Sequence, residues 1–297
     1  MVAAVRCERM QTRPDILVLG GGGRQGDAWM TGVLAGLEDA RGISFAACDY
    51  VAGTSAGSIV AAKLISGRRL KRPATDTSAA ACERQPPAEA IAEAALRLAS
   101  PLAAAGLRLV TPPGELARSV ALSLMPTSGR ETLDFTAAFP PETVRFDGRL
   151  RVVAVDRRAG RRVVFGAPGA PAATVAEALR ASCALPLVFG PALIGGREYV
   201  DGATWTPTNA DAAPATHGAQ VLILAPMASL HGPFIAALRA ATRAAMLLEV
   251  ATLRGRGALV RTVTPDLASA AAIGSDLMAG AGLDQTHAAG YAQGLGL

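Results

Sequence analysis

The chain has 297 residues, of which 51% are apolar and 18% are charged, and its formal net charge is +5. This composition is typical of a globular chain with a sizeable core and excludes an intrinsically disordered one. Aromatic residues make up only 4% of the chain and the arginines are scattered, so the sequence predicts no nucleic-acid-binding face. The four cysteines form no Cys-x-x-Cys pair and lie far from the three histidines, which predicts no metal site and reduced thiols in the cytoplasm.

Residues 1–14 form a basic, polar N-terminal tail without the apolar run of a secretion signal. No window reaches the roughly 18 uncharged apolar residues of a membrane-spanning helix, because the most apolar stretch, 234–250, contains two arginines and a glutamate. We therefore expect a cytoplasmic protein. Peripheral contact with a membrane stays open, since a basic cluster after the second expected helix could bind anionic headgroups or lie solvated at a helix C-terminus. The cluster comprises Lys63, Arg68, Arg69, Lys71 and Arg72.

The most informative stretch is residues 53–57 (Gly-Thr-Ser-Ala-Gly), which lies between a short apolar run and a helix-like run at 58–65. This order predicts a strand, a sharp turn and a helix, with Ser55 on a strained backbone that pushes its hydroxyl outward. Gly53 and Gly57 are required because a side chain at either position would collide with the neighbouring strand or helix. The context predicts that Ser55 is a nucleophile.

A glycine-rich turn at residues 20–26 (Gly-Gly-Gly-Gly-Arg-Gln-Gly) follows a buried strand predicted at 15–19 and precedes a helix predicted to end near Arg41. Together with the serine turn, this β-α-β-α order predicts a parallel sheet covered by helices. Because the carboxyl ends of parallel strands share one edge, we expect the glycine turn and Ser55 to meet. Backbone N–H groups at such a turn, beside a helix N-terminus, are suited to bind an oxyanion.

The rest of the chain predicts a continued sheet interrupted by one insertion. Residues 68–148 break the β-α rhythm and form this insertion, with helices expected at 91–98 and 115–124. The later elements are strands at 150–155 and 162–165, a helix at 176–182 capped by Thr174 and Glu177, a hairpin at 193–200, a strand at 220–225 and a helix at about 234–254. We expect a tail at 1–14, a catalytic unit at 15–226 and a helical extension at 227–297 that packs on the core.

Two residues compete for the role of general base. Asp201 ends an apolar strand and is followed by Gly202 and Ala203, so its carboxylate could bond the serine hydroxyl directly. The same residues also fit an ordinary Asp-Gly turn. His217 lies sixteen residues further on and completes the chain order of a Ser-Asp-His triad, but it also fits a solvated loop histidine. The residues by themselves leave the choice open.

With these pieces in order, the chain resembles the patatin-like phospholipase family over roughly residues 15–226. The motifs that carry the resemblance are residues 20–26, residues 53–57 and the run Asp201-Gly202-Ala203. The resemblance implies a three-layer α/β/α sandwich with a mainly parallel sheet, no cofactor, and hydrolysis of a lipid or acyl ester through an acyl-serine intermediate. It also implies a catalytic dyad of Ser55 and Asp201 without a catalytic histidine.

The resemblance also gives roles to the remaining motif residues. It implies an oxyanion hole of backbone N–H groups at Gly21, Gly22, Gly23 and Arg24, and supporting positions at Gly26, Gly53, Gly57 and Gly202. Many family members read Gly-Gly-Gly-x-Arg-Gly, whereas here Gln25 separates Arg24 from Gly26. The sequence therefore leaves open which amides form the oxyanion hole.

Two other functions stay open at this point. The glycine turn also matches Gly-x-Gly-x-x-Gly between a strand and a helix, which is a dinucleotide-binding fingerprint. In that interpretation Asp49 would have to bind a ribose, although it begins the next strand instead of ending it. A catalytically silent binder of lipid or protein could also keep the same fold. The sequence predicts neither the oligomeric state nor the particular ester.

Overall fold

The computed structural model describes residues 13–73, 112–125, 131–229 and 236–297. Among these residues, eight strands form a mainly parallel sheet in the order β5-β6-β3-β2-β1-β7-β8, with β4 paired to β3 outside this path. Strands β4, β5 and β6 are antiparallel to their neighbours, and the other pairs are parallel. The strands are β1 (Ile16–Leu19), β2 (Tyr50–Thr54), β3 (Leu150–Asp156), β4 (Arg161–Phe165), β5 (Ala192–Ile194), β6 (Arg197–Asp201), β7 (Gln220–Leu224) and β8 (Leu259–Val263).

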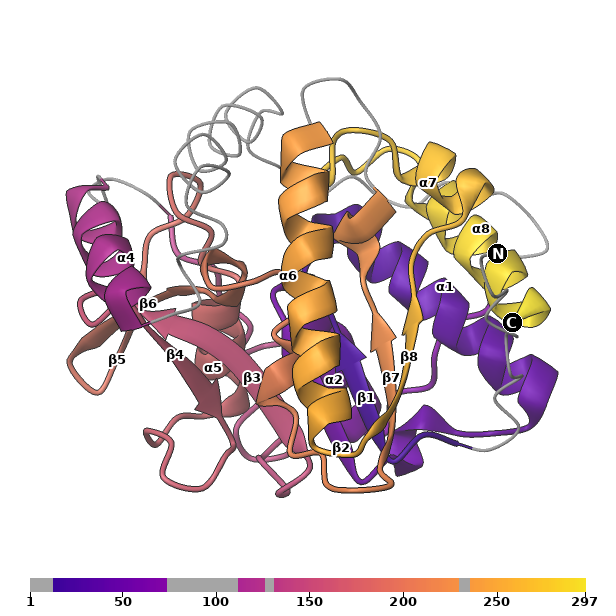
Figure 1. The fold of residues 1–297 in the computed structure, drawn as a ribbon, viewed down its shortest axis with the longest axis horizontal. Helices are drawn as coiled ribbons and strands as arrows, with labels where there is room; N and C mark the ends of the chain where they lie inside the picture. Colours follow the sequence, from indigo (N-terminus) through magenta and orange to yellow (C-terminus); the bar gives the residue numbers. More distant parts are fainter. Residues whose placement is uncertain (1–12, 74–111, 126–130, 230–235) are drawn as a thin grey trace.

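Helices cover both faces of this sheet, which gives the three-layer α/β/α architecture expected from the sequence (Figure 1). Helices α1, α2 and α5 share one core with Leu17 and Val51. Helix α6 packs against Ile16 on the opposite face, and α4 covers Val155 and Val200 on that same face. The helices are α1 (Gly23–Arg41), α2 (Ala56–Ile65), α4 (Pro112–Leu124), α5 (Val175–Ser182), α6 (Ala236–Gly255), α7 (Leu267–Ile273) and α8 (Leu283–Gly296).

The central strands are apolar on both faces because both faces are covered. Every residue of β1 and β3 is buried, and β1 and residues 152–155 of β3 are apolar without alternation, as is typical of strands with both faces covered. This is why the sequence predicted the strands of the central sheet correctly up to β7, with ends that differ by one or two residues. The hairpin predicted at 193–200 is confirmed as β5 and β6.

Helix α5 begins with the capping box that the sequence predicted. The N–H of Glu177 donates to Thr174 Oγ1 (3.2 Å), and the N–H of Thr174 donates to the Glu177 carboxylate (2.7 Å). The helix predicted at 115–124 is confirmed within α4, which begins three residues earlier, at Pro112. The helix expected at 91–98 lies outside the described residues, as does most of the insertion.

The helical extension predicted after residue 226 is confirmed, with the helix expected at about 234–254 present as α6, and the structure adds one strand that the sequence did not predict. Strand β8 pairs with β7 at the edge of the sheet, where its side chains are mostly half exposed and form no continuous apolar run. Helix α8 lies against α1 (Figure 1). A Cβ atom at Gly32 or Gly36 of α1, or at Gly290 or Gly294 of α8, would overlap the backbone of the other helix. The extension is therefore packed directly on the helix that follows the glycine loop.

Candidate active site

Ser55 lies on the turn between β2 and α2 in a strained conformation, with φ at 52° and ψ at −124°. A positive φ is uncommon for a residue with a side chain and points to a functional constraint. A Cβ atom at Gly57 would overlap the carbonyl oxygens of Leu19 and Gly20, and one at Gly53 would overlap the backbone of the next helix turn. These overlaps are the steric clashes that the sequence analysis predicted for a side chain at either position.

A second serine, which the sequence did not single out, holds the turn from α5. The N–H of Ser55 donates to Ser182 Oγ (2.9 Å), and the Ser182 hydroxyl donates to the carbonyl of Val153 (2.6 Å). On the other side, the hydroxyl of Ser58 donates to the carbonyl of Ser55 (2.6 Å). No local signal could have identified Ser182, since it reaches Ser55 only because α5 packs beside α2 and β3.

Asp201 is the last residue of β6, and the sheet topology brings it beside the serine turn. On one side of β3, Ala154 pairs with Asp201; on the other side, Val153 pairs with Thr54, the residue before the serine. One strand therefore separates the two chain segments, and the hydroxyl of Ser55 lies close enough to the carboxylate of Asp201 to lower its pKa. The structure thus brings the two residues that the sequence proposed as a pair to the same edge of the sheet.

The carboxylate of Asp201 is buried, with only 2% of the residue exposed. Burial raises its pKa to about 7, although the hydrogen bonds from the Ala203 N–H (2.8 Å) and from Ser55 act in the opposite direction. Removal from water disfavours the charged form of an acid, and a pKa near neutrality suits a group that must take up and release a proton. The arrangement can therefore accept the serine proton at neutral pH.

The glycine loop meets the serine turn at the same edge of the sheet. A Cβ atom at Gly21 would lie 3.5 Å from the Cβ of Ser55. The N–H of Gly21, however, already donates to the carbonyl of Pro207 (2.7 Å). We therefore leave Gly21 out of the candidate oxyanion donors, because a donor committed to a carbonyl is not available to an oxyanion.

The next three backbone amides of the loop differ from that of Gly21 in their hydrogen bonding. Helix α1 begins at Gly23, and the first N–H groups of a helix have no acceptor within the helix. In the part of the chain that the structure describes, no protein acceptor receives the N–H groups of Gly22, Gly23 or Arg24. These three amides remain candidates for binding an anion.

Gln25, the residue that departs from the family pattern, is incorporated into α1 and buried. Its side-chain amide donates to the carbonyls of Ala279 (3.0 Å) and Ala281 (2.9 Å) and accepts a hydrogen bond from the Thr286 hydroxyl (2.6 Å). Its backbone N–H donates to the carbonyl of Leu277 (3.0 Å). The additional residue therefore ties the glycine loop to the segment that connects α7 and α8.

The alternative residues do not reach this edge. His217 is exposed in the loop before β7, where a Cβ atom at Gly257, just before β8, would touch its ring. That loop lies at the amino end of β7, whereas Ser55 follows the carboxyl end of β2, and both strands run parallel to β1. Asp49 precedes β2 and lies 3.7 Å from Arg13. The histidine of a triad and the acid of a dinucleotide site are therefore both at the opposite end of the strands.

The basic cluster after α2 is partly neutralised by its own neighbours. Lys63 lies 2.9 Å from Asp27, and Arg72 lies 2.6 Å from Asp39. Arg68 donates to the carbonyl of Ala138 and lies over the ring of Phe139. These pairings weaken the case for a headgroup-binding surface. No helix within the described ranges is both long and apolar enough to cross a membrane.

Comparison with known proteins gives the family. The model of the family described as patatin-like phospholipase matches residues 17–214, which is roughly two thirds of the chain, and the chain belongs to this family. Its members are typically lipid acyl hydrolases. Among solved structures, the chain is similar to the crystal structure of VipD from Legionella pneumophila, with 14% identity and a TM-score of 0.45. That match covers 96% of this chain but only 66% of the other. No curated protein matches the chain.

Proposed function

We propose that this protein is a serine acyl hydrolase that cleaves lipid or related acyl esters with a dyad of Ser55 and Asp201. The observation that carries the proposal is the position of the buried carboxylate of Asp201, one strand away from the Ser55 turn and close enough for the serine hydroxyl to lower its pKa. The strained backbone of Ser55 and the membership of the chain in a family of lipid acyl hydrolases support it.

In the first half of the reaction, Ser55 Oγ attacks the acyl carbonyl while its proton passes to the Asp201 carboxylate. The tetrahedral intermediate carries a negative oxygen, for which the N–H groups of Gly22, Gly23 and Arg24 are the proposed donors. Such donors at a helix N-terminus stabilise the developing charge without reorganisation. The intermediate collapses by breaking the ester C–O bond, and the leaving alkoxide takes the proton from Asp201. The products are an alcohol and an acyl-serine.

In the second half, a water molecule attacks the acyl-serine and gives its proton to Asp201. The second tetrahedral intermediate uses the same amides, and its collapse breaks the bond to Ser55 Oγ. Asp201 returns the proton to this oxygen, which releases the carboxylic acid and regenerates the serine. A single carboxylate can serve both halves because its pKa, raised by burial to about 7, lets it alternate between base and acid.

Hydrolysis of nitrophenyl esters of increasing chain length tests this proposal. We expect Ser55→Ala and Asp201→Asn to lower turnover by about 10³-fold or more, because each removes a group that acts only in the reaction. His217→Ala should retain most of the activity and serves as the control. A fluorophosphonate probe should label the wild-type protein and leave Ser55→Ala unlabelled.

Two results would contradict the proposal. Loss of activity in a folded His217→Ala variant would favour a three-residue relay. A pure, folded wild-type protein that neither hydrolyses these esters nor reacts with the probe would favour a silent binder of the same fold.

A further inference from the structure

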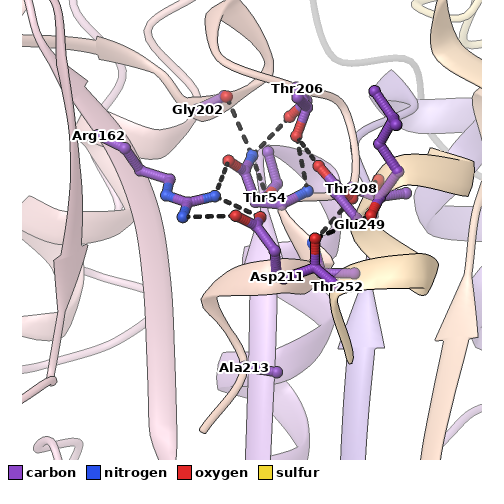
Figure 2. A network of polar contacts seen from close by, with 12 residues as sticks. Thr54, Arg162, Gly202, Thr206, Thr208, Asp211, Ala213, Glu249 and Thr252 are labelled. Carbon is purple, nitrogen blue, oxygen red and sulfur yellow. Dashed lines mark hydrogen bonds and ion pairs between the residues drawn. The ribbon is translucent and has the colours of Figure 1, made fainter. Parts of the chain in front are cut away.

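One buried amide touches both chain segments of the proposed dyad. Asn209 is fully buried, and its Nδ2 donates to Thr54 Oγ1 (3.2 Å) and to the carbonyl of Gly202 (3.1 Å). Thr54 directly precedes Ser55, and Gly202 directly follows Asp201. Figure 2 shows both Thr54 and Gly202 within this network. The Asn209 side chain therefore connects the serine turn to the aspartate loop.

The surroundings of Asn209 fix the orientation of its amide and explain why this residue type is needed. The carbonyl of Thr206 is a third acceptor of Nδ2, so the two N–H groups of the amide are shared among three acceptors, and Arg162 Nη1 donates to its Oδ1 (3.4 Å). Because carbonyl oxygens only accept, the nitrogen must face Gly202 and Thr206. The backbone of Asn209 is left-handed, with φ at 50°, and asparagine tolerates this conformation better than most residues.

A carboxylate from another part of the chain holds the same loop from outside. Glu249 of α6 is 5% exposed and accepts hydrogen bonds from the hydroxyls of Thr206 and Thr208 and from the N–H of Ala210 (2.9 Å). Figure 2 shows Glu249 beside the two threonines. These contacts fix the residues on both sides of Asn209, although α6 lies beyond the residues that the family model matches.

We propose that Asn209, seated by Glu249, is a positioning residue that sets the contact between Ser55 and Asp201; this inference rests on the proposed function. Strand β3 lies between the serine turn and the aspartate loop, and the amide of Asn209 connects the two segments past this strand. Proton transfer within a dyad requires hydrogen-bond distance, and a displacement of about 1 Å can cost 10²-fold in rate. An amide that donates to both segments restricts that displacement without touching the substrate.

The main test is Asn209→Gly, because glycine fits the left-handed backbone without strain and removes only the amide. We expect kcat for a nitrophenyl ester to fall about 10- to 100-fold while KM changes less than about threefold. The rate of labelling by a fluorophosphonate should fall with kcat. A loss confined to kcat separates a positioning role from general damage to the fold.

The partner residue Thr54 gives a matched pair of variants. Thr54→Val keeps the shape but removes the acceptor, so kcat should fall as it does in Asn209→Gly. Thr54→Ser keeps the hydroxyl and should remain within about threefold of wild type. Because both changes break the same hydrogen bond, the double variant should be no slower than the slower single variant beyond about twofold.

Ser269→Ala is the control for loss of a buried hydroxyl. Ser269 is fully buried on α7 and donates to Gln293 Oε1 (2.9 Å), away from the dyad, so its loss should leave kcat unchanged. Unchanged kcat in Asn209→Gly, or equal losses in Thr54→Ser and Thr54→Val, would overturn the positioning role. If Ser55→Ala stays active in the same assay, the proposed function itself fails; if Ser55→Ala is inactive while Asn209→Gly is fully active, only the positioning role fails.

Discussion

The serine turn and the aspartate loop lie at the same edge of the sheet, but different forces hold them. At residues 53–57 the backbones of β1, β2 and α2 approach so closely that only glycine fits at Gly53 and Gly57. The loop from Gly202 to Asn209 also begins at a position where only glycine fits, since a Cβ atom at Gly202 would overlap the carbonyl oxygen of Val153. Beyond Gly202 it is held by side chains, including the amide of Asn209 and the carboxylate of Glu249. Close backbone contacts therefore dominate in the serine turn, and a polar network dominates in the rest of the aspartate loop.

This difference predicts how each region responds to substitution. A backbone atom that blocks a side chain cannot move without displacing a strand, so the steric restraint is nearly all-or-none. A hydrogen bond contributes about 1 kcal/mol net and can be removed singly, so the polar restraint is graded. The variants below test this contrast, from the largest expected effect to the smallest.

Gly57→Ala should have the largest effect on stability. Its Cβ atom would overlap the carbonyl oxygens of Leu19 and Gly20, so we expect the free energy of unfolding to fall by about 3 kcal/mol or more. Urea denaturation measures this loss. Gly255→Ala is the control, since no heavy atom lies within 4 Å of its Cβ position, and it should be neutral or slightly stabilising. Equal free energies of unfolding for the two variants would contradict the steric explanation of why position 57 is glycine.

The pH dependence of activity should follow the buried carboxylate. Because burial raises the pKa of Asp201 to about 7, and only the ionised form can accept the serine proton, kcat/KM should rise about tenfold per pH unit below pH 7. Above that pH it should level off. A profile that is flat from pH 5 to 8 would argue against Asp201 as the base.

The same carboxylate should make stability fall as the pH rises. The pKa of Asp201 is about 7 in the folded state, whereas an exposed aspartate in the unfolded chain has a pKa of 3.8. Between these two pH values the native state therefore binds more protons than the unfolded state. The stabilisation is complete below pH 4 and is lost as the pH rises through 7. Asp201→Asn cannot ionise, so its free energy of unfolding relative to wild type should increase from pH 4 to pH 8. Denaturation series at several pH values measure this difference, and a constant offset would contradict it.

Glu249→Gln tests the polar network with a smaller expected effect. One oxygen that accepts from buried donors becomes an NH₂ group, so we expect a loss of about 2 kcal/mol in the free energy of unfolding. Glu198→Gln is a matched control, because this glutamate pairs with Arg157 at 2.6 Å but its side chain is 43% exposed. Its replacement should cost less than about 1 kcal/mol. Similar losses of unfolding free energy in the two variants would mean that burying the network does not increase its contribution to stability.

His217→Ala should have the smallest effect of all. The side chain is exposed at the amino end of β7, away from Ser55, so both kcat and the thermal midpoint should stay close to wild type. A midpoint lowered by more than about 4 °C would show a structural role for the loop that the contacts do not indicate.

Much of this molecule was predictable because its signals are local. Ser55 and its two glycines form one continuous strand–turn–helix pattern, and β1 and residues 152–155 of β3 are continuous apolar runs. The parallel sheet covered by helices follows from the order of such elements, and the three-layer architecture was implied by the resemblance to the patatin-like family. Strand β8 was not predictable, since an edge strand with half-exposed side chains carries neither a continuous apolar run nor a clear alternation.

The donors of the glycine loop show where local patterns stop. The motif treats Gly21 and its neighbours alike, yet only Gly21 meets the carbonyl of Pro207. In the sequence, Gln25 is only a departure from the family pattern. In the structure, its side chain ties the glycine loop to the C-terminal extension through hydrogen bonds with Ala279, Ala281 and Thr286. Both outcomes depend on segments more than 180 residues away in the chain.

The sequence by itself determined the chemistry that the chain can offer: a serine on a strained turn, an acid at a strand end and free amides at a helix start. Each of these groups depends on a few consecutive residues, so a short segment of the sequence is enough to predict it. The tertiary structure decided which of these groups meet, by placing Asp201 one strand away from Ser55 and His217 at the opposite end of the sheet. Contact between residues far apart in the chain depends on sheet register and on packing by α5, α6 and α8, which no short segment encodes.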